Sequence, residues 1–526
     1  MYLLIFLFPF IFLLIFNKIL KENTKVWKFI LILFTNLLVN ISLYINYRYP
    51  EIFIFLFSFQ IINLNIVINK INLDSKKIIL IYSLISLCTL IFFFSFTYTQ
   101  NKNKSLDEAE TDYKIFYPTE DNFSDTIQLA SSIETIFSSK DLANVKGLKK
   151  NFISNNVYKI AVVKEICNDQ ISNPICLGGI INDTPRYYGL PPLYLFYIYC
   201  LGLFLKFVNN VTIFITILFI ILSFIIYKIL KNISSNYLIF FLITIFSYPY
   251  MFAYQRGNFV SLTVFILLLM LNLKLRNEKL NLIFNVVVLS IITNFRPNIL
   301  LLVPLVLLNK SAKRTLVNSL TFIFSYLLIT FSSFKFLENN LLNYNIETFK
   351  YNFLNYGEEN LYQYVLNGDG FNNSFYSFFL LIKFHLQNIV LEIFKYDLNK
   401  ILDVTYYNII FLIIIMLSIF VYLLYITDKF SFKDSYTLLI LFCLLISPKT
   451  GDYYLLLILI PLFNYFSNKN NYEKLILINC FLIIAPKPHS YFEPVYGISL
   501  GLFINVISMI IIILLLINKN VKLKKL

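Results

Sequence analysis

Long apolar segments, separated by short polar ones, follow one another along almost the whole chain. Many of these segments are about 17 to 25 residues long, the length at which an α-helix crosses the hydrocarbon core of a bilayer. The segments at 78–98, 210–230 and 315–335 are examples. The pattern predicts an all-α fold, a polytopic helical membrane protein with about 15 transmembrane helices.

The composition fits the same class. Hydrophobic residues make up 58% of the chain and charged residues 14%, whereas a soluble domain needs roughly a quarter charged residues to cover its surface. The net charge of +15 comes largely from lysines in short loops between apolar segments, as the positive-inside rule requires of cytoplasmic loops. A nucleic-acid partner is therefore not expected.

Charge and length also suggest how the chain is divided. Residues 1–77 are expected to form an N-terminal extension of about three transmembrane helices. The first apolar segment, residues 2–17, has no preceding basic region and no small-residue cleavage site, so it is interpreted as a retained helix. Residues 78–517 would form the membrane core, and residues 518–526 a basic tail in the cytoplasm.

Placing the lysine-rich loops inside leaves two long loops, 100–186 and 336–400, on the outer face. The segment 191–207 is apolar enough to span, but if it spanned, the lysine-rich loops that follow would lie outside. We therefore expect this segment, and the amphipathic stretch 375–395, to lie along the outer surface as interfacial helices.

Five short polar clusters interrupt the apolar pattern, and this topology places all five on the outer face. Polar groups at a bilayer surface are costly unless they have a role, so their convergence predicts a catalytic cavity at the membrane edge. The clusters are Thr111-Asp112-Tyr113 with Tyr117; Tyr188-Gly189-Leu190-Pro191-Pro192; Arg256-Gly257-Asn258; Arg296-Pro297; and Ser447-Pro448-Lys449 with Asp452-Tyr453.

The acidic stretch in the first outer loop offers a general base. By its composition alone, the stretch fits a solvated acidic loop better than a catalytic one. Asp112 is the first candidate, because the aromatic side chains of Tyr113 and Phe116 beside it would desolvate the carboxylate and raise its pKa. Asp125, which follows Phe123 and Ser124, is the second candidate.

Three outward cations, Arg256, Arg296 and Lys449, each come at a helix end. Any one of them fits a side chain that snorkels to the lipid headgroups. Three cations at the same depth of the outer face fit a site that binds a phosphate better. Each of them is next to a glycine or proline that interrupts the helix. Arginine would bind the phosphate through two parallel N–H donors and lysine as a point charge.

The order of these motifs resembles glycosyltransferase family 87 of the GT-C membrane superfamily, over about residues 78–517. The segment from Tyr188 to Leu193 is similar to the family's Y-P-P-L motif, with an insertion, and Phe371-Asn372-Asn373-Ser374 loosely resembles its G-N-x-S segment. The Arg-Gly-Asn, Arg-Pro and Ser-Pro-Lys motifs also match. One departure concerns the base, since the helix of small residues that the family shows after its aspartate follows Asp125 here, not Asp112.

The resemblance implies a GT-C-like fold that transfers a sugar, often mannose, from a polyprenyl-phosphate donor with inversion. The acceptor would be a lipid or glycan on the outer face of the plasma membrane, and either Asp112 or Asp125 would be the base. The donor is a substrate, so no cofactor is expected, and the role of a metal and the oligomeric state stay open. The donor-binding residues would be Tyr188, Arg256, Asn258, Arg296, Asn373, Lys449, Asp452 and Tyr453.

Other classes of membrane protein fit the composition too. A polysaccharide flippase or polymerase, or a transporter, would also be rich in helices, but a transporter should show internal repeats and charged residues at midspan. A structural subunit would not need the ordered polar clusters. The chain lacks a G-x-x-x-x-G-K-[ST] loop, which disfavours a nucleotide-sugar donor. The pair Cys167 and Cys176 is compatible with a disulfide and with two thiols.

Overall fold

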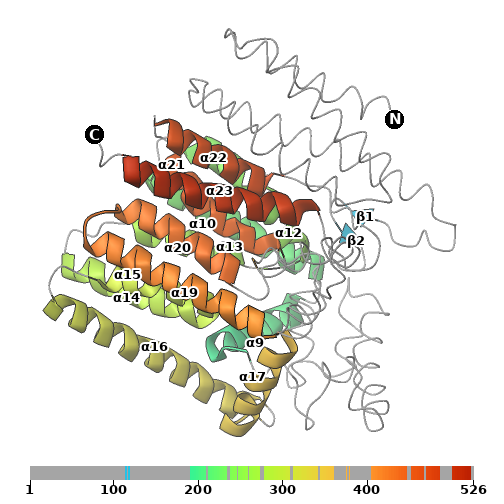
Figure 1. The fold of residues 1–526 in the computed structure, drawn as a ribbon. Helices are drawn as coiled ribbons and strands as arrows, with labels where there is room; N and C mark the ends of the chain where they lie inside the picture. Colours follow the sequence, from blue (N-terminus) through green and yellow to red (C-terminus); the bar gives the residue numbers. More distant parts are fainter. Residues whose placement is uncertain are drawn as a thin grey trace, which may run out of the picture. The chain divides into compact units, whose positions relative to one another are not determined.

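In the computed structural model the chain falls into two compact units. Figure 1 shows their helices and strands as a ribbon. The predicted N-terminal extension 1–77, most of the outer loop 100–186, and the pair Cys167 and Cys176 lie outside the described residues. The structure describes residues 113–114, 117–118, 190–208, 211–233, 237–245, 247–256, 258, 260–272, 278–308, 312–341, 344–360, 375, 378, 404–446, 452–466, 470–485 and 500–522.

Nearly all described residues are helical, which confirms the all-α prediction for this part of the chain. The exception is an antiparallel pair of two-residue strands, β1 (Tyr113–Lys114) and β2 (Tyr117–Pro118), in which Tyr113 pairs with Pro118. The sequence does not predict this pair, because two residues are too few to show the alternation typical of a strand.

The unit of residues 111–246 and 250–364 is built around the helix α14. This helix packs along α16, and both contact α9, whereas α10 packs against α11 and α13. Its elements are α9 (Pro192–Val208), α10 (Val211–Ile233), α11 (Tyr237–Ile245), α12 (Tyr248–Arg256), α13 (Val260–Asn272), α14 (Glu278–Phe295), η3 (Pro297–Leu302), α15 (Val303–Leu307), α16 (Ala312–Asn340) and α17 (Ile346–Asn360).

The other unit takes most of its described residues from the C-terminal third of the chain. Helices α22 and α23 run side by side, α20 packs against α19 and α23, and α21 packs against α22 (Figure 1). Its elements are α19 (Val404–Ile426), α20 (Phe432–Ile446), η6 (Asp452–Ile458), α21 (Leu459–Tyr465), α22 (Asn471–Ile484) and α23 (Leu500–Lys522).

The predicted outer loop 336–400 begins with helical structure that the sequence pattern did not reveal. Helix α16 continues to Asn340, and α17 follows after a short turn. The Asn345 side chain accepts hydrogen bonds from the backbone N–H groups of Glu347 and Thr348, at 3.0 and 2.9 Å, and Thr348 Oγ1 accepts one from the Asn345 N–H. This reciprocal cap begins α17, whose sequence mixes polar and apolar residues.

Two of the described helices are long and apolar enough to cross a membrane, Lys313–Asn340 and Ile409–Ile426. In their most apolar stretches, only 17% and 22% of the residues are buried inside the protein. Large apolar side chains such as Phe324, Phe331 and Leu412 are mostly exposed on them. These faces therefore do not contribute to a protein core.

Candidate functional site

Two of the ten predicted site residues, Asn258 and Arg296, have described side chains. For three others only the backbone is described: Arg256 is the last residue of α12, and Asp452 and Tyr453 begin η6. Because the latter two and Arg296 belong to different units, the structure does not test whether they share a site. The remaining predictions, Asp112, Asp125, Tyr188, Asn373 and Lys449, lie outside the described residues.

Arg296 occupies the junction between α14 and η3. Its backbone N–H donates to the Ile292 carbonyl at 2.8 Å, and its carbonyl accepts from the Ile299 N–H at 3.0 Å. Pro297 follows as the first residue of η3, where its fixed φ and missing N–H are tolerated. The backbone of Arg296 is thus held on both sides, while its side chain is half-buried and makes no capping hydrogen bond to η3.

The Arg296 guanidinium lies over the ring of Tyr194, 5.5 Å from its centroid. Tyr194 belongs to the first turn of α9, which begins at Pro192. Phe295 presents its ring edge-on to Tyr194 and Tyr197, with centroids 6.1 and 5.6 Å apart. The structure therefore places Arg296 of the predicted Arg-Pro cluster against the first turn of α9, the helix that begins at Pro192.

These rings give Arg296 a partly apolar setting. Burial raises the pKa of Tyr197 well above its usual value, Tyr194 raises it further, and the positive charge of Arg296 opposes the shift. Tyr197 consequently stays neutral at physiological pH. A cation over an aromatic face gains about 0.5–2 kcal/mol, more when it is desolvated.

The Arg256-Gly257-Asn258 cluster ends a helix. The backbone N–H of Asn258 donates to the Ala253 carbonyl, five residues back, at 2.7 Å. This is the longer of the two hydrogen bonds of a Schellman cap, in which the residue before the donor is commonly glycine. Asn258 is buried. The pattern Arg-Gly-Asn therefore has a structural role as a helix terminus, and the three-cation phosphate site stays a prediction.

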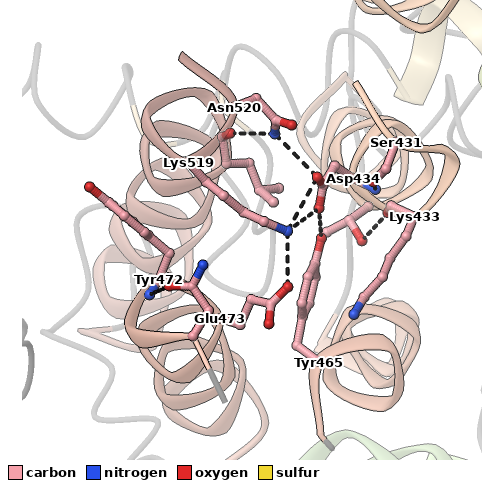
Figure 2. A network of polar contacts seen from close by, with 11 residues as sticks. Ser431, Lys433, Asp434, Tyr465, Tyr472, Glu473, Lys519 and Asn520 are labelled. Atoms are coloured by element: carbon pink, nitrogen blue, oxygen red, sulfur yellow. Dashed lines mark hydrogen bonds and ion pairs between the residues drawn. The ribbon is translucent and has the colours of Figure 1, made fainter. Parts of the chain in front are cut away.

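Sequence reasoning missed a cluster of charged residues in the other unit (Figure 2). Lys519 Nζ donates to Asp434 Oδ1 at 3.0 Å and to Glu473 Oε1 at 2.9 Å. The Tyr465 hydroxyl donates to Asp434 Oδ1 at 2.6 Å, and Asn520 Nδ2 donates to Asp434 Oδ2 at 3.2 Å. The sequence pattern assigns Lys519 to the basic cytoplasmic tail, residues 518–526. The available signal was that each acid falls in the first turn of an apolar helix.

Comparisons with protein-family models, with curated proteins and with solved structures find no match to this chain. Within the described ranges, no group of three or more histidine, cysteine, aspartate or glutamate side chains is placed to hold a metal ion. The candidate site is therefore supported by the contacts of its own residues, chiefly those of Arg296.

Proposed function

We propose that this chain is an integral membrane glycosyltransferase. It would transfer a sugar, such as mannose, from a polyprenyl-phosphate donor to a lipid or glycan acceptor on the outer face of the plasma membrane. The observation that supports this most is the contact between Arg296 of the Arg-Pro cluster and Tyr194, which lies two residues after the Pro-Pro cluster. Pro192 and Arg296 are 104 residues apart in sequence, and both clusters belong to the motif order that suggested the family.

The exposed apolar helices support the membrane setting. In a soluble protein, an apolar helix long enough to span a bilayer is normally a buried core helix. Helices α16 and α19 instead present large apolar side chains to their surroundings, Leu320, Phe324 and Phe331 among them. Exposed apolar faces along helices long enough to span a bilayer favour lipid as their surroundings.

In the proposed reaction, Arg296 binds the donor phosphate through its in-plane N–H groups while Tyr194 supports the guanidinium from its face. The acceptor hydroxyl oxygen attacks the anomeric carbon, and Asp112 takes the hydroxyl proton. The bond between the anomeric carbon and the phosphate oxygen breaks, which inverts the anomeric centre. The phosphate leaves with one more negative charge, and a preorganised cation stabilises that charge in the transition state.

A transfer assay tests this function. Membranes containing the chain are supplied with a panel of labelled polyprenyl-phosphate sugars, and lipid and glycan products are separated. One donor should yield a glycosidic product, and Asp112→Asn should lower its rate about 10²- to 10⁴-fold, as expected for loss of a general base. If Asp125→Asn has that effect instead, Asp125 is the base. Labelled glycan that crosses the membrane with no new glycosidic bond would support a flippase and contradict the proposal.

The outer location of the site has a separate test. Single cysteines at Asn101 and Asn372 should react with a membrane-impermeant thiol reagent from outside, in a background with the native cysteines replaced by serine. A cysteine at Asn518, which is exposed near the end of α23, should react only after permeabilisation. Labelling of residue 101 only after permeabilisation would overturn the proposed topology.

A further inference from the structure

The charged cluster of Figure 2 joins three helices at one end of their unit. Asp434 comes from the first turn of α20, Glu473 from the first turn of α22, and Lys519 from the last turn of α23. Asp434 and Lys519 are only 2% and 8% exposed. Charges buried to this extent require partners, because the desolvation cost of an unpaired ion is several kcal/mol.

Asp434 is saturated with hydrogen bonds from side chains. Lys519 contacts both of its oxygens, at 3.0 and 3.3 Å, and Tyr465 and Asn520 contact one oxygen each. Its backbone N–H donates to the Ser431 hydroxyl at 3.1 Å, which caps α20. These contacts leave little capacity for an external ligand, so the arrangement is suited to holding helices together.

Lys519 links the two acids. Its Nζ lies within 3.0 Å of an oxygen of each, so the two carboxylates approach within about 6 Å of one another. Burial lowers the pKa of Lys519, but its hydrogen bond to Glu473 and the charge of Asp434 outweigh that effect and raise it. Burial likewise raises the pKa of Asp434, and the bonds from Tyr465 and Lys519 reverse the shift and lower it.

The other charged groups near the cluster belong to α20, α22 and the turn before α20. Lys433 Nζ lies 4.2 Å from the centroid of the Tyr465 ring, and burial lowers its pKa while Glu473 opposes that shift. Lys474 is buried next in sequence to Glu473, and Asp428 and Lys429 are exposed. Among the α23 residues whose side chains the structure describes, Lys519 brings a cation to this end.

We propose that Lys519 holds α23 against α20 and α22. These two helices pack stably with Asp434 and Glu473 close together only when the Lys519 ammonium lies between the two carboxylates. The acids precede Lys519 in the chain by 85 and 46 residues. Insertion of α23 therefore completes the unit, and the fold of this part of the molecule depends on its last helix.

This role of Lys519 predicts that the wild type and Lys519→Met differ in how their stability depends on pH. In the wild type the pKa of Asp434 is lowered, so its contribution is present above the ordinary carboxyl value of about 3.9 and is lost as the pH falls through the lower folded value. In Lys519→Met the two acids repel one another without a cation between them. At least one of them then takes up a proton more readily when folded, so this variant gains stability as the pH falls from 8 to 5.

The experiment is a thermal unfolding series on the purified full chain in detergent at pH 5, 6.5 and 8. Lys519→Met should lower Tm at pH 8 by on the order of 10 °C, and by less at pH 5. Lys335→Met is the matched control, because Lys335 pairs with Glu338 at 2.6 Å on an exposed face of α16, and its Tm should change by less than about 2 °C.

A second variant keeps the test decisive if Lys519→Met does not fold. Removing both acids together with the lysine, in Asp434→Asn/Glu473→Gln/Lys519→Met, should restore folding and most of the lost Tm at pH 8. A Lys519→Met variant with the Tm of the wild type, or with the same loss at every pH, would overturn the proposal. Failure of the triple variant to recover would overturn it as well.

Discussion

Arg296 and Lys519 are both basic residues at helix ends, yet their surroundings differ in kind. Arg296 lies over an aromatic ring, beside Phe295, and its backbone is fixed by the step from α14 to η3. Lys519 lies between two carboxylates that use its donors and neutralise its charge. A ring face attracts a cation through its π electrons, whereas a carboxylate accepts hydrogen bonds from it. The contacts of Lys519 therefore stabilise the fold, whereas the role that we propose for Arg296 is to bind a ligand.

The largest expected effect is that loss of the Arg296 charge lowers activity without lowering stability. Arg296→Gln should lower the transfer rate about 10²- to 10³-fold, because the leaving phosphate loses a preorganised donor. Its Tm should stay within about 2 °C of the wild type, since the side chain is only half-buried. Turnover and thermal unfolding are measured on the same preparation. A large fall in Tm with normal turnover per folded molecule would place Arg296 with the structural cations.

A smaller effect is expected when the charge is kept and the planar group is lost. Arg296→Lys should retain part of the activity and lose roughly 10-fold in rate, because an ammonium cannot donate two parallel N–H bonds to a phosphate. Steady-state kinetics with the active donor provides the measurement. Full activity in Arg296→Lys would mean that a point charge is sufficient and that the bidentate contact is not made.

The smallest effect concerns the ring beneath the guanidinium. Tyr194→Leu should slow transfer by about 3- to 10-fold, in line with the energy of one cation–π contact, while Tyr194→Phe should keep the wild-type rate. Tyr199→Leu is the matched control, since Tyr199 is on the same helix and its ring contacts Phe336. Equal losses in Tyr194→Leu and Tyr199→Leu would show that the effect is general damage to α9.

The sequence predicted the helical class because apolar length and loop charge are local properties. That Arg296 and the Pro-Pro turn share one site stays a prediction, and the sequence did not indicate the ring of Tyr194 as the group that contacts the guanidinium. It did not predict α17, whose start depends on the short-range cap at Asn345. It missed the partners of Lys519 because those acids are distant in sequence, and only packing brings them to one lysine.

The central claim, that Arg296 receives the leaving phosphate, is tested most directly by binding. Equilibrium dissociation constants are measured for the purified wild type and Arg296→Gln with polyprenyl phosphate and with its sugar-bearing form. Free polyprenyl phosphate carries the charge that develops as the glycosidic bond breaks, so its affinity should fall about 10-fold or more in Arg296→Gln. The affinity for the sugar-bearing donor should fall less. Unchanged affinity for both lipids would contradict the account.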